Sequence, residues 1–271
     1  FFFTDPYDQS VLKPDDVTFT NTLSPFTNLT YYKSFNNRSS EERFKSYFAI
    51  NANSRLGFGF YIDYLYGRGM YNNQSTAFFN GGLFSSYRGD KYDMHFIFNN
   101  DNLKMRENGG ITDDRYITDP LDMAEGKKQY ASTDIPTLFN KIWNHNTSYH
   151  AFLTHRYNLG FYKEVNDSLA NDNLPTDSIQ AANDTLVSPQ KFIPVTSFIH
   201  TLEMDFNGRK YITQDDAQNR QYFEHTFFGN DSIDQNRRTS IRNTLGISLR
   251  EGFNKWAKAG LTAFVTHEYR D

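Results

Sequence analysis

Hydrophobic and polar residues alternate along most of this chain, and residues 44–66 show the pattern most clearly. On the far side of a break at residues 53–54, large apolar side chains such as Leu56, Phe58 and Phe60 fall at every second position. Period two predicts β-strands, because successive side chains of a strand point to opposite faces. Each arm keeps the pattern for about nine to twelve residues, close to the ~9–11 of a tilted transmembrane strand. The stretch therefore predicts a long β-hairpin with one face suited to lipid.

The same alternation predicts antiparallel strands along the rest of the chain. The expected strands cover residues 17–21, 26–33, 44–52, 56–66, 76–87, 92–98, 135–144, 147–162 and 192–206, a strand beginning at 211, and then 240–251 and 256–270. This succession is a meander of hairpins. The preceding residues 1–16 contain two prolines and no strand pattern, so we expect an irregular N-terminal segment there.

The lengths of the expected connections support one architecture. Short turns are predicted at residues 53–54, 88–90, 145–146, 207–208 and 252, and they alternate with longer connections at 67–74, 108–134, 163–190 and 213–238. Transmembrane barrels have short periplasmic turns and longer extracellular loops. We therefore predict an all-β protein in which residues 17–271 form an antiparallel, up-and-down transmembrane β-barrel. The connection 108–134 is long enough to fold into such a barrel and plug it.

Composition agrees with a barrel whose interior is polar. The chain has 26 Phe and 18 Tyr, yet its mean hydropathy is −0.71. No run of ~18 apolar residues predicts a membrane helix. The net charge is −4 with both signs interspersed, which argues against a nucleic-acid partner. The absence of cysteine excludes disulfide and thiolate chemistry.

Several stretches, taken in order, carry a family resemblance. They are NTLSPFTNLTYY (21–32), NSRLGFGFYIDY (53–64), ENGGI (107–111), THRYNLGFYKE (154–164) and FIPVTSFIHTLEMDF (192–206). With these stretches the chain resembles the putative porins of Bacteroidota outer membranes. The resemblance implies an outer-membrane β-barrel with a channel function. Such barrels usually end in an aromatic residue, whereas this sequence stops at Arg270-Asp271, so we expect a partial barrel whose closing strands lie outside it.

The inward phase of the predicted strands carries the candidate functional residues. Charged inward residues either tune which solutes pass through a channel or pair with one another and fill the lumen; both interpretations stay open here. The candidate lumen-lining residues are Lys45, Asp63, Asp93, His95, Arg156, Glu203, Asp205, Arg242 and Arg250.

Catalytic and metal sites find less support in the sequence. Neither a GxSxG nor an HExxH motif is present, so we expect no enzyme. His145, His150 and His155 recur every five residues, a spacing that alternates faces on a strand. We therefore assign no catalytic residue, metal ligand or cofactor.

A short motif recurs in the predicted polar loops. Asp followed by Ser or Thr and then Leu or Ile resembles the O-glycosylation sequon of Bacteroidota, and it occurs four times. The hypothesis is that these loops are extracellular and carry glycans; the alternative is that Asp and Ser are simply common in polar loops. The candidate positions are Ser168, Ser178, Thr185 and Ser232.

Two functions are compatible with these features. The first is a channel in the bacterial outer membrane for passive passage of small solutes, with lipid as its surroundings. The second is a non-conducting structural or accessory barrel within a larger complex of outer-membrane proteins or lipoproteins. A soluble β-sandwich is a third interpretation, which the alternation of connection lengths disfavours.

Overall fold

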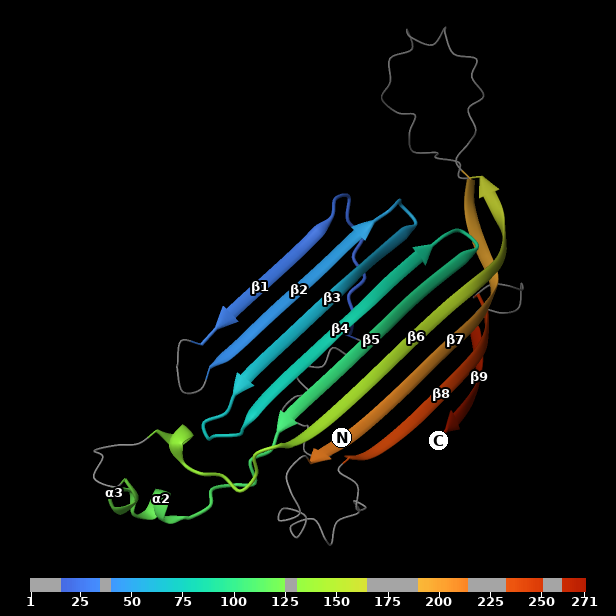
Figure 1. Cartoon of the computed structure of the whole chain (residues 1–271). Coiled ribbons are helices and arrows are strands. Elements are labelled where there is room, and N and C mark those ends of the chain that lie inside the picture. Colours follow the sequence, from blue (N-terminus) through green and yellow to red (C-terminus); the bar gives the residue numbers. More distant parts are fainter. Residues whose placement is uncertain (1–15, 35–39, 125–130, 165–189, 214–232, 251–259) are drawn as a thin grey trace, which may run out of the picture.

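Nine antiparallel strands form one sheet in the computed structural model, which describes residues 16–34, 40–124, 131–164, 190–213, 233–250 and 260–271. Each strand pairs with the next one along the chain, from β1 to β9 (Figure 1). The strands are β1 (Phe26–Lys33), β2 (Glu41–Asn51), β3 (Leu56–Arg68), β4 (Ser75–Arg88), β5 (Tyr92–Arg106), β6 (Ile142–Glu164), β7 (Gln190–Thr213), β8 (Ile233–Leu249) and β9 (Leu261–Arg270). The prediction of an all-β, antiparallel, up-and-down fold is confirmed.

The sheet is open in this structure. Strands β1 and β9 each pair with one neighbour among the described residues, so the outer edges of both strands are unpaired. In Figure 1, strands β7–β9 bend out of the plane of β1–β5. The closed barrel expected from the sequence is therefore not what the described strands form by themselves.

Apart from the single 3₁₀ residue Asp16, helical structure in the described part of the chain lies in one connection. Between β5 and β6 lie two single-turn helices, α2 (Arg115–Thr118) and α3 (Pro120–Met123), and a 3₁₀ turn, η2 (Ser132–Asp134). None of the helices in the described part of the chain is both long and apolar enough to cross a membrane.

Two predicted turns are wrong. Strands β6 and β7 are 23 and 24 residues long, and they run without interruption through residues 145–146 and 207–208. Gly208 pairs with Thr147 of β6 on one side and with Arg237 of β8 on the other. Pairing on both sides satisfies the backbone groups at this Asn-Gly step, which outweighs its local preference for a turn. The Asn207 side chain joins the ladder as well, because its Oδ1 accepts a hydrogen bond of 2.8 Å from the Ser148 hydroxyl.

Because β6 and β7 are continuous, the connections are divided between the two ends of the sheet differently from the prediction. The short turns at residues 52–55 and 89–91 lie at one end, and residues 165–189 connect β6 to β7 at this same end. The opposite end takes the connections 34–40, 69–74, 107–141 and 214–232. The prediction that short and long connections alternate strictly is therefore wrong, because the long connection 165–189 lies at the same end of the sheet as the short turns.

The glycosylation candidates do not share one end of the sheet. Ser168, Ser178, Thr185 and Ser232 all lie outside the described residues. The first three fall between β6 and β7, however, and Ser232 falls between β7 and β8. These two connections join the strands at opposite ends of the sheet. A sheet that spans a membrane would place the two groups on opposite sides. The expectation that all four lie outside the cell is thus not supported.

Glycines opposite aromatic residues let neighbouring strands pack closely. Gly59 pairs with Phe84, and a Cβ on Gly59 would lie 2.4 Å from Cζ of that ring and 2.3 Å from the Phe48 carbonyl oxygen. Gly82 pairs with Tyr61, whose ring would lie 2.5 Å from an added Cβ. The rings therefore cover the glycine backbone, an arrangement that shields a sheet where a side chain is missing.

Substituting Gly59 with Ala should destabilise the sheet. The added methyl group meets a backbone carbonyl that cannot move alone, and overpacking of this kind typically costs about 1–3 kcal/mol. Gly67→Ala is the matched control in the same strand, since nothing lies within 4 Å of the added Cβ. Heat-dependent unfolding in detergent, followed by the shift in gel mobility, measures both variants. Equal midpoints for the two would contradict this packing.

Candidate functional site on the inner face

The strand register divides the side chains of the sheet between two faces. Tyr47 pairs with Tyr61, Tyr61 with Gly82, Gly82 with Asn99 and Asn99 with His150. We call the face that carries these residues the inner face. Their sequence neighbours, such as Phe48 and Phe60, lie on the outer face, because side chains alternate along a strand.

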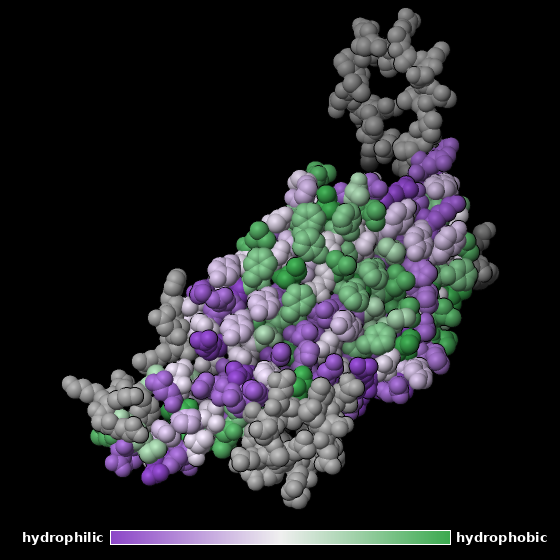
Figure 2. All heavy atoms as spheres, in the orientation of Figure 1, coloured by the Kyte–Doolittle hydropathy of each residue, from purple (hydrophilic) through white to green (hydrophobic). Residues whose placement is uncertain are grey.

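The outer face is apolar and exposed. Figure 2 shows hydrophobic side chains gathered over the middle and upper parts of the strands and hydrophilic ones at their lower ends. Phe48 and Phe60 stack with their ring centroids 5.4 Å apart. Exposed apolar residues lie on strands β1–β4 and β6–β9; examples are Leu29, Phe44, Phe58, Phe60, Leu83, Tyr149, Phe198, Leu245, Ile247 and Val265. A continuous exposed apolar surface of this kind marks contact with a membrane or another protein.

The sequence-predicted candidates of the nine strands share the opposite face. Register places eight of them on the inner face: Lys45, Asp63, Asp93, His95, Arg156, Glu203, Asp205 and Arg242. Arg250 follows the end of β8, and its backbone N–H donates to the Val195 carbonyl. Whether these residues line a lumen depends on closure of the sheet, so that assignment stays a prediction.

Several of the inner-face charges pair between neighbouring strands. Asp63 accepts two hydrogen bonds from Arg43, of 2.9 and 2.7 Å, and lies 3.4 Å from the Lys45 ammonium. Glu203 binds Arg242 across β7 and β8 at 2.7 Å. Pairing along the sheet thus accounts for part of the inner charge. Arg156 is different, since it is exposed and forms no ion pair with any described residue.

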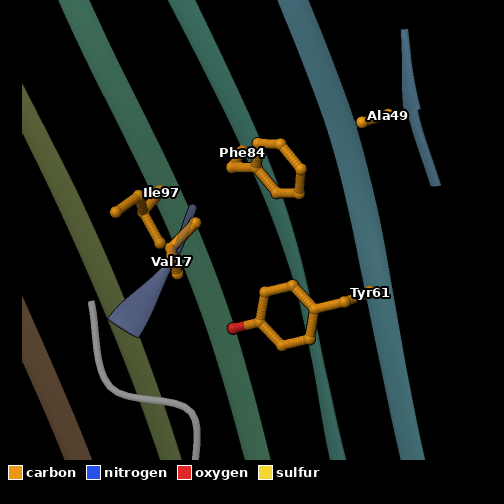
Figure 3. Close-up of a cluster of buried hydrophobic side chains, with 5 residues drawn as sticks. All are labelled: Val17, Ala49, Tyr61, Phe84 and Ile97. Atoms are coloured by element: carbon orange, nitrogen blue, oxygen red, sulfur yellow. The ribbon is translucent and has the colours of Figure 1, made fainter. Parts of the chain in front are cut away.

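Residues 16–22 lie against the inner face as an N-terminal strap. Val17 is 9% exposed and packs with Ala49, Tyr61, Phe84 and Ile97 from strands β2–β5 (Figure 3). The prediction of a strand at residues 17–21 is wrong, because this segment crosses the sheet and does not pair with it. The inner face at β2–β5 is therefore covered by the chain itself.

Polar contacts anchor the strap at both of its ends. The Tyr47 hydroxyl donates to the Thr18 carbonyl at 2.8 Å, and the Asn51 side chain binds both Asn21 and the Thr22 N–H. Between these anchors the Phe19 ring packs edge-on against His95, at 4.9 Å between ring centroids. His95 is thereby a partner of the strap.

The described parts of the connection, residues 107–124 and 131–141, do not fill the inner face. They lie beyond the strand ends in Figure 1, where Ser132 binds the Met70 carbonyl and Asn73 binds Thr137. The Arg115 guanidinium donates three hydrogen bonds to Asp113 in this connection and its backbone N–H donates a fourth, and these bonds lower the pKa of the Asp113 carboxyl. The residues that cover part of the face are thus those of the strap, a role the sequence analysis did not foresee.

Strands β4–β7 carry a polar cluster on the inner face. Asp101 accepts hydrogen bonds from the side-chain amides of Asn80 and Asn99. His150 lies opposite Asn99, and its Nδ1 is 2.5 Å from Asp205 Oδ1. The uncovered part of the inner face is therefore hydrophilic, with carboxylates, amides and an imidazole in contact.

The outer face also holds a polar pair that the apolar pattern conceals. His155 Nε2 and His200 Nδ1 are 2.9 Å apart, and His200 lies 3.4 Å from Asn243 Oδ1. The two histidines border a pocket of about 430 Å³ whose other walls are mostly apolar, among them Phe198 and Leu245. The alternation of apolar residues along β6 and β7 includes both histidines, but it does not reveal that they touch across the two strands.

Phe19→Ala should release the strap. The chain has no cysteine, so Val17→Cys provides a unique reporter whose labelling by a maleimide is slow while the strap is docked. Losing the Phe19 ring removes roughly 1–2 kcal/mol of apolar contact, which corresponds to about 5–30-fold faster labelling.

Leu23→Ala in the same Val17→Cys background is the control. Leu23 follows the strap directly and is fully exposed, so its truncation should leave the labelling rate unchanged. Fast labelling of Val17→Cys before any further substitution would show that residues 16–22 are not docked in solution.

Comparison with known proteins identifies one family. The family model described as putative porin matches residues 1–271, which is the whole chain. No curated protein and no solved structure matches the sequence.

Proposed function

The chain belongs to the putative porin family, and from this we propose that it forms a channel in the bacterial outer membrane through which small solutes pass passively. Membership of this family also supports a role that is not enzymatic. The observation that carries the proposal is the division of one sheet into an exposed apolar outer face and a hydrophilic inner face.

The outer face supports contact with lipid. A transmembrane strand needs only ~9–11 residues to cross the hydrocarbon. Strands β3–β8 are 13–24 residues long, so they extend beyond it. The outer face of β5 turns polar at Asn100 and Asn102, towards the end that continues into residues 107–141. The apolar band is thus bounded along the strands, as lipid-facing bands of outer-membrane barrels are.

The inner face supports an aqueous path. Membrane-spanning strands must satisfy their backbone groups, so the edges of β1 and β9 have to be paired in the membrane, with each other or through further strands. The inner face then becomes the lumen wall. Solutes would travel along β6–β8, because the strap covers the face at β2–β5.

Leu245→Arg tests contact with lipid. Leu245 is 63% exposed, so an arginine there would be nearly neutral in water, whereas a charge in the lipid mid-plane costs about 2–4 kcal/mol. Thr244→Arg is the control, since the neighbouring residue points to the inner face. The fraction of folded protein in the membrane, measured by heat modifiability, should fall for Leu245→Arg and much less for Thr244→Arg. The reverse order would argue for a water-facing outer surface.

Arg156→Gln tests conduction and the role of the inner charge. Purified protein in planar bilayers should show discrete conductance steps. Removing an exposed positive charge from the lumen wall should then shift the reversal potential in a salt gradient towards greater cation permeability, because fixed charge attracts counter-ions. Arg115→Gln, in the connection beyond the strand ends, makes the same chemical change and should leave the reversal potential unchanged. Absence of conductance in correctly folded protein would reject the channel.

The strap favours a second candidate. A barrel whose inner face is partly covered by its own chain conducts less, and this favours a structural or accessory subunit of an outer-membrane complex. Conductance that appears only after Phe19→Ala, together with stable co-purification of other membrane proteins, would favour this function over the first.

A further inference from the structure

His150, Glu203 and Asp205 form a compact group of metal-ligating side chains on the inner face. His150 lies on β6 directly opposite Asp205 of β7, and Glu203 is two residues away on the same face. One ligand atom from each residue lies within 4.8 Å of the other two. Imidazole nitrogen with carboxylate oxygen is a donor set that suits Zn²⁺ and related divalent ions.

The imidazole of His150 has one nitrogen bound and one unsatisfied. Nδ1 is 2.5 Å from Asp205 Oδ1, and an ionised carboxylate can only accept, so Nδ1 carries the proton. In the neutral ring Nε2 then holds a lone pair. This nitrogen is buried and has no hydrogen-bond partner among the described residues, while the side chain as a whole is 12% exposed. A carboxylate that fixes the tautomer of a histidine in this way is the usual support of a metal-ligating imidazole.

Negative charge around the imidazole is only partly balanced. Asp205 and the diagonal neighbour Asp101 form no ion pair with a lysine or arginine in the part of the chain that is described. Glu203 binds Arg242 through Oε2, which leaves Oε1 for another cation. Buried carboxylates are normally paired or coordinate metals. The side chains of Glu203 and Asp205 are 25% and 33% exposed, so ions in solution can reach them.

We propose that His150, Glu203 and Asp205 bind a divalent cation of the Zn²⁺ class on the inner face. His150 Nε2 and Glu203 supply the protein ligands, Asp205 holds the imidazole from Nδ1, and water completes the coordination. Arg242 holds Glu203 in place from the side of β8. The site requires only the strand register, and it does not depend on whether the protein conducts.

Calorimetric titration of metal-stripped protein with ZnCl₂ in detergent tests the site. The outer-face pair His155 and His200 could itself bind zinc, so the experiment starts from the His155→Gln/His200→Gln double variant. This background should bind one Zn²⁺ per chain. Adding His150→Gln or Asp205→Asn should weaken binding by at least about 10–100-fold, the usual effect of altering a ligand or its support. Adding His267→Gln, a histidine of the exposed strand β9, should change nothing.

The alternative is that the contact between His150 and Asp205 only links β6 to β7 and that the group binds no metal. No zinc binding by the double variant would establish this and overturn the proposal, as would unchanged affinity in folded His150→Gln and Asp205→Asn. If either substitution prevents folding, X-ray absorption of the cobalt-loaded double variant decides. One imidazole nitrogen among oxygen ligands supports the site, and oxygen ligands alone reject it.

Discussion

The continuous antiparallel ladder is the constraint on which the rest of this molecule depends. Each strand pairs with its neighbour in sequence, and among the described pairs a register shift occurs between Leu159 and Gly160. A slip by one residue would move every side chain of a strand to the other face. The ladder therefore keeps aromatic residues such as Phe60 apart from charged ones such as Asp63 along one strand. The two faces exist because the register is continuous along the strands apart from this one shift near the end of β6.

Local features of the sequence were sufficient to predict much of this fold. The expected hairpin at residues 44–66 is present, with Phe48 opposite Phe60, and its turn is held by Asn53, whose Oδ1 accepts from the N–H groups of Arg55 and Leu56. In this hairpin the turn preference and the strand pairing agree. At Asn207-Gly208 they conflict, and pairing with two neighbouring strands prevails. A single sequence reveals the local preference, but not the number of neighbours that a strand will have.

The candidate site could be predicted only in part, for the same physical reason. Period two places Glu203, Asp205 and Arg242 on one face without any knowledge of their neighbours. Which of them touch is a matter of register between β6, β7 and β8. The spacing of histidines along the chain argued against a metal site, yet His150 meets its carboxylates across the sheet and not along its own strand. The strap was missed because its apolar residues, Val17 and Phe19, have the same alternation as a short strand.

The position of the strap also constrains the order in which the molecule can assemble. Residues 16–22 precede β2–β5 in the sequence, but the surface that receives Val17 is built jointly by those four strands and does not exist before they pair. Docking must therefore follow formation of this part of the sheet, against the order of the chain. If the two edges later meet to form a barrel, docking must also come before closure, because afterwards the segment would have to be threaded into a finished cylinder. The strap thus has a limited interval during folding in which it can reach its place.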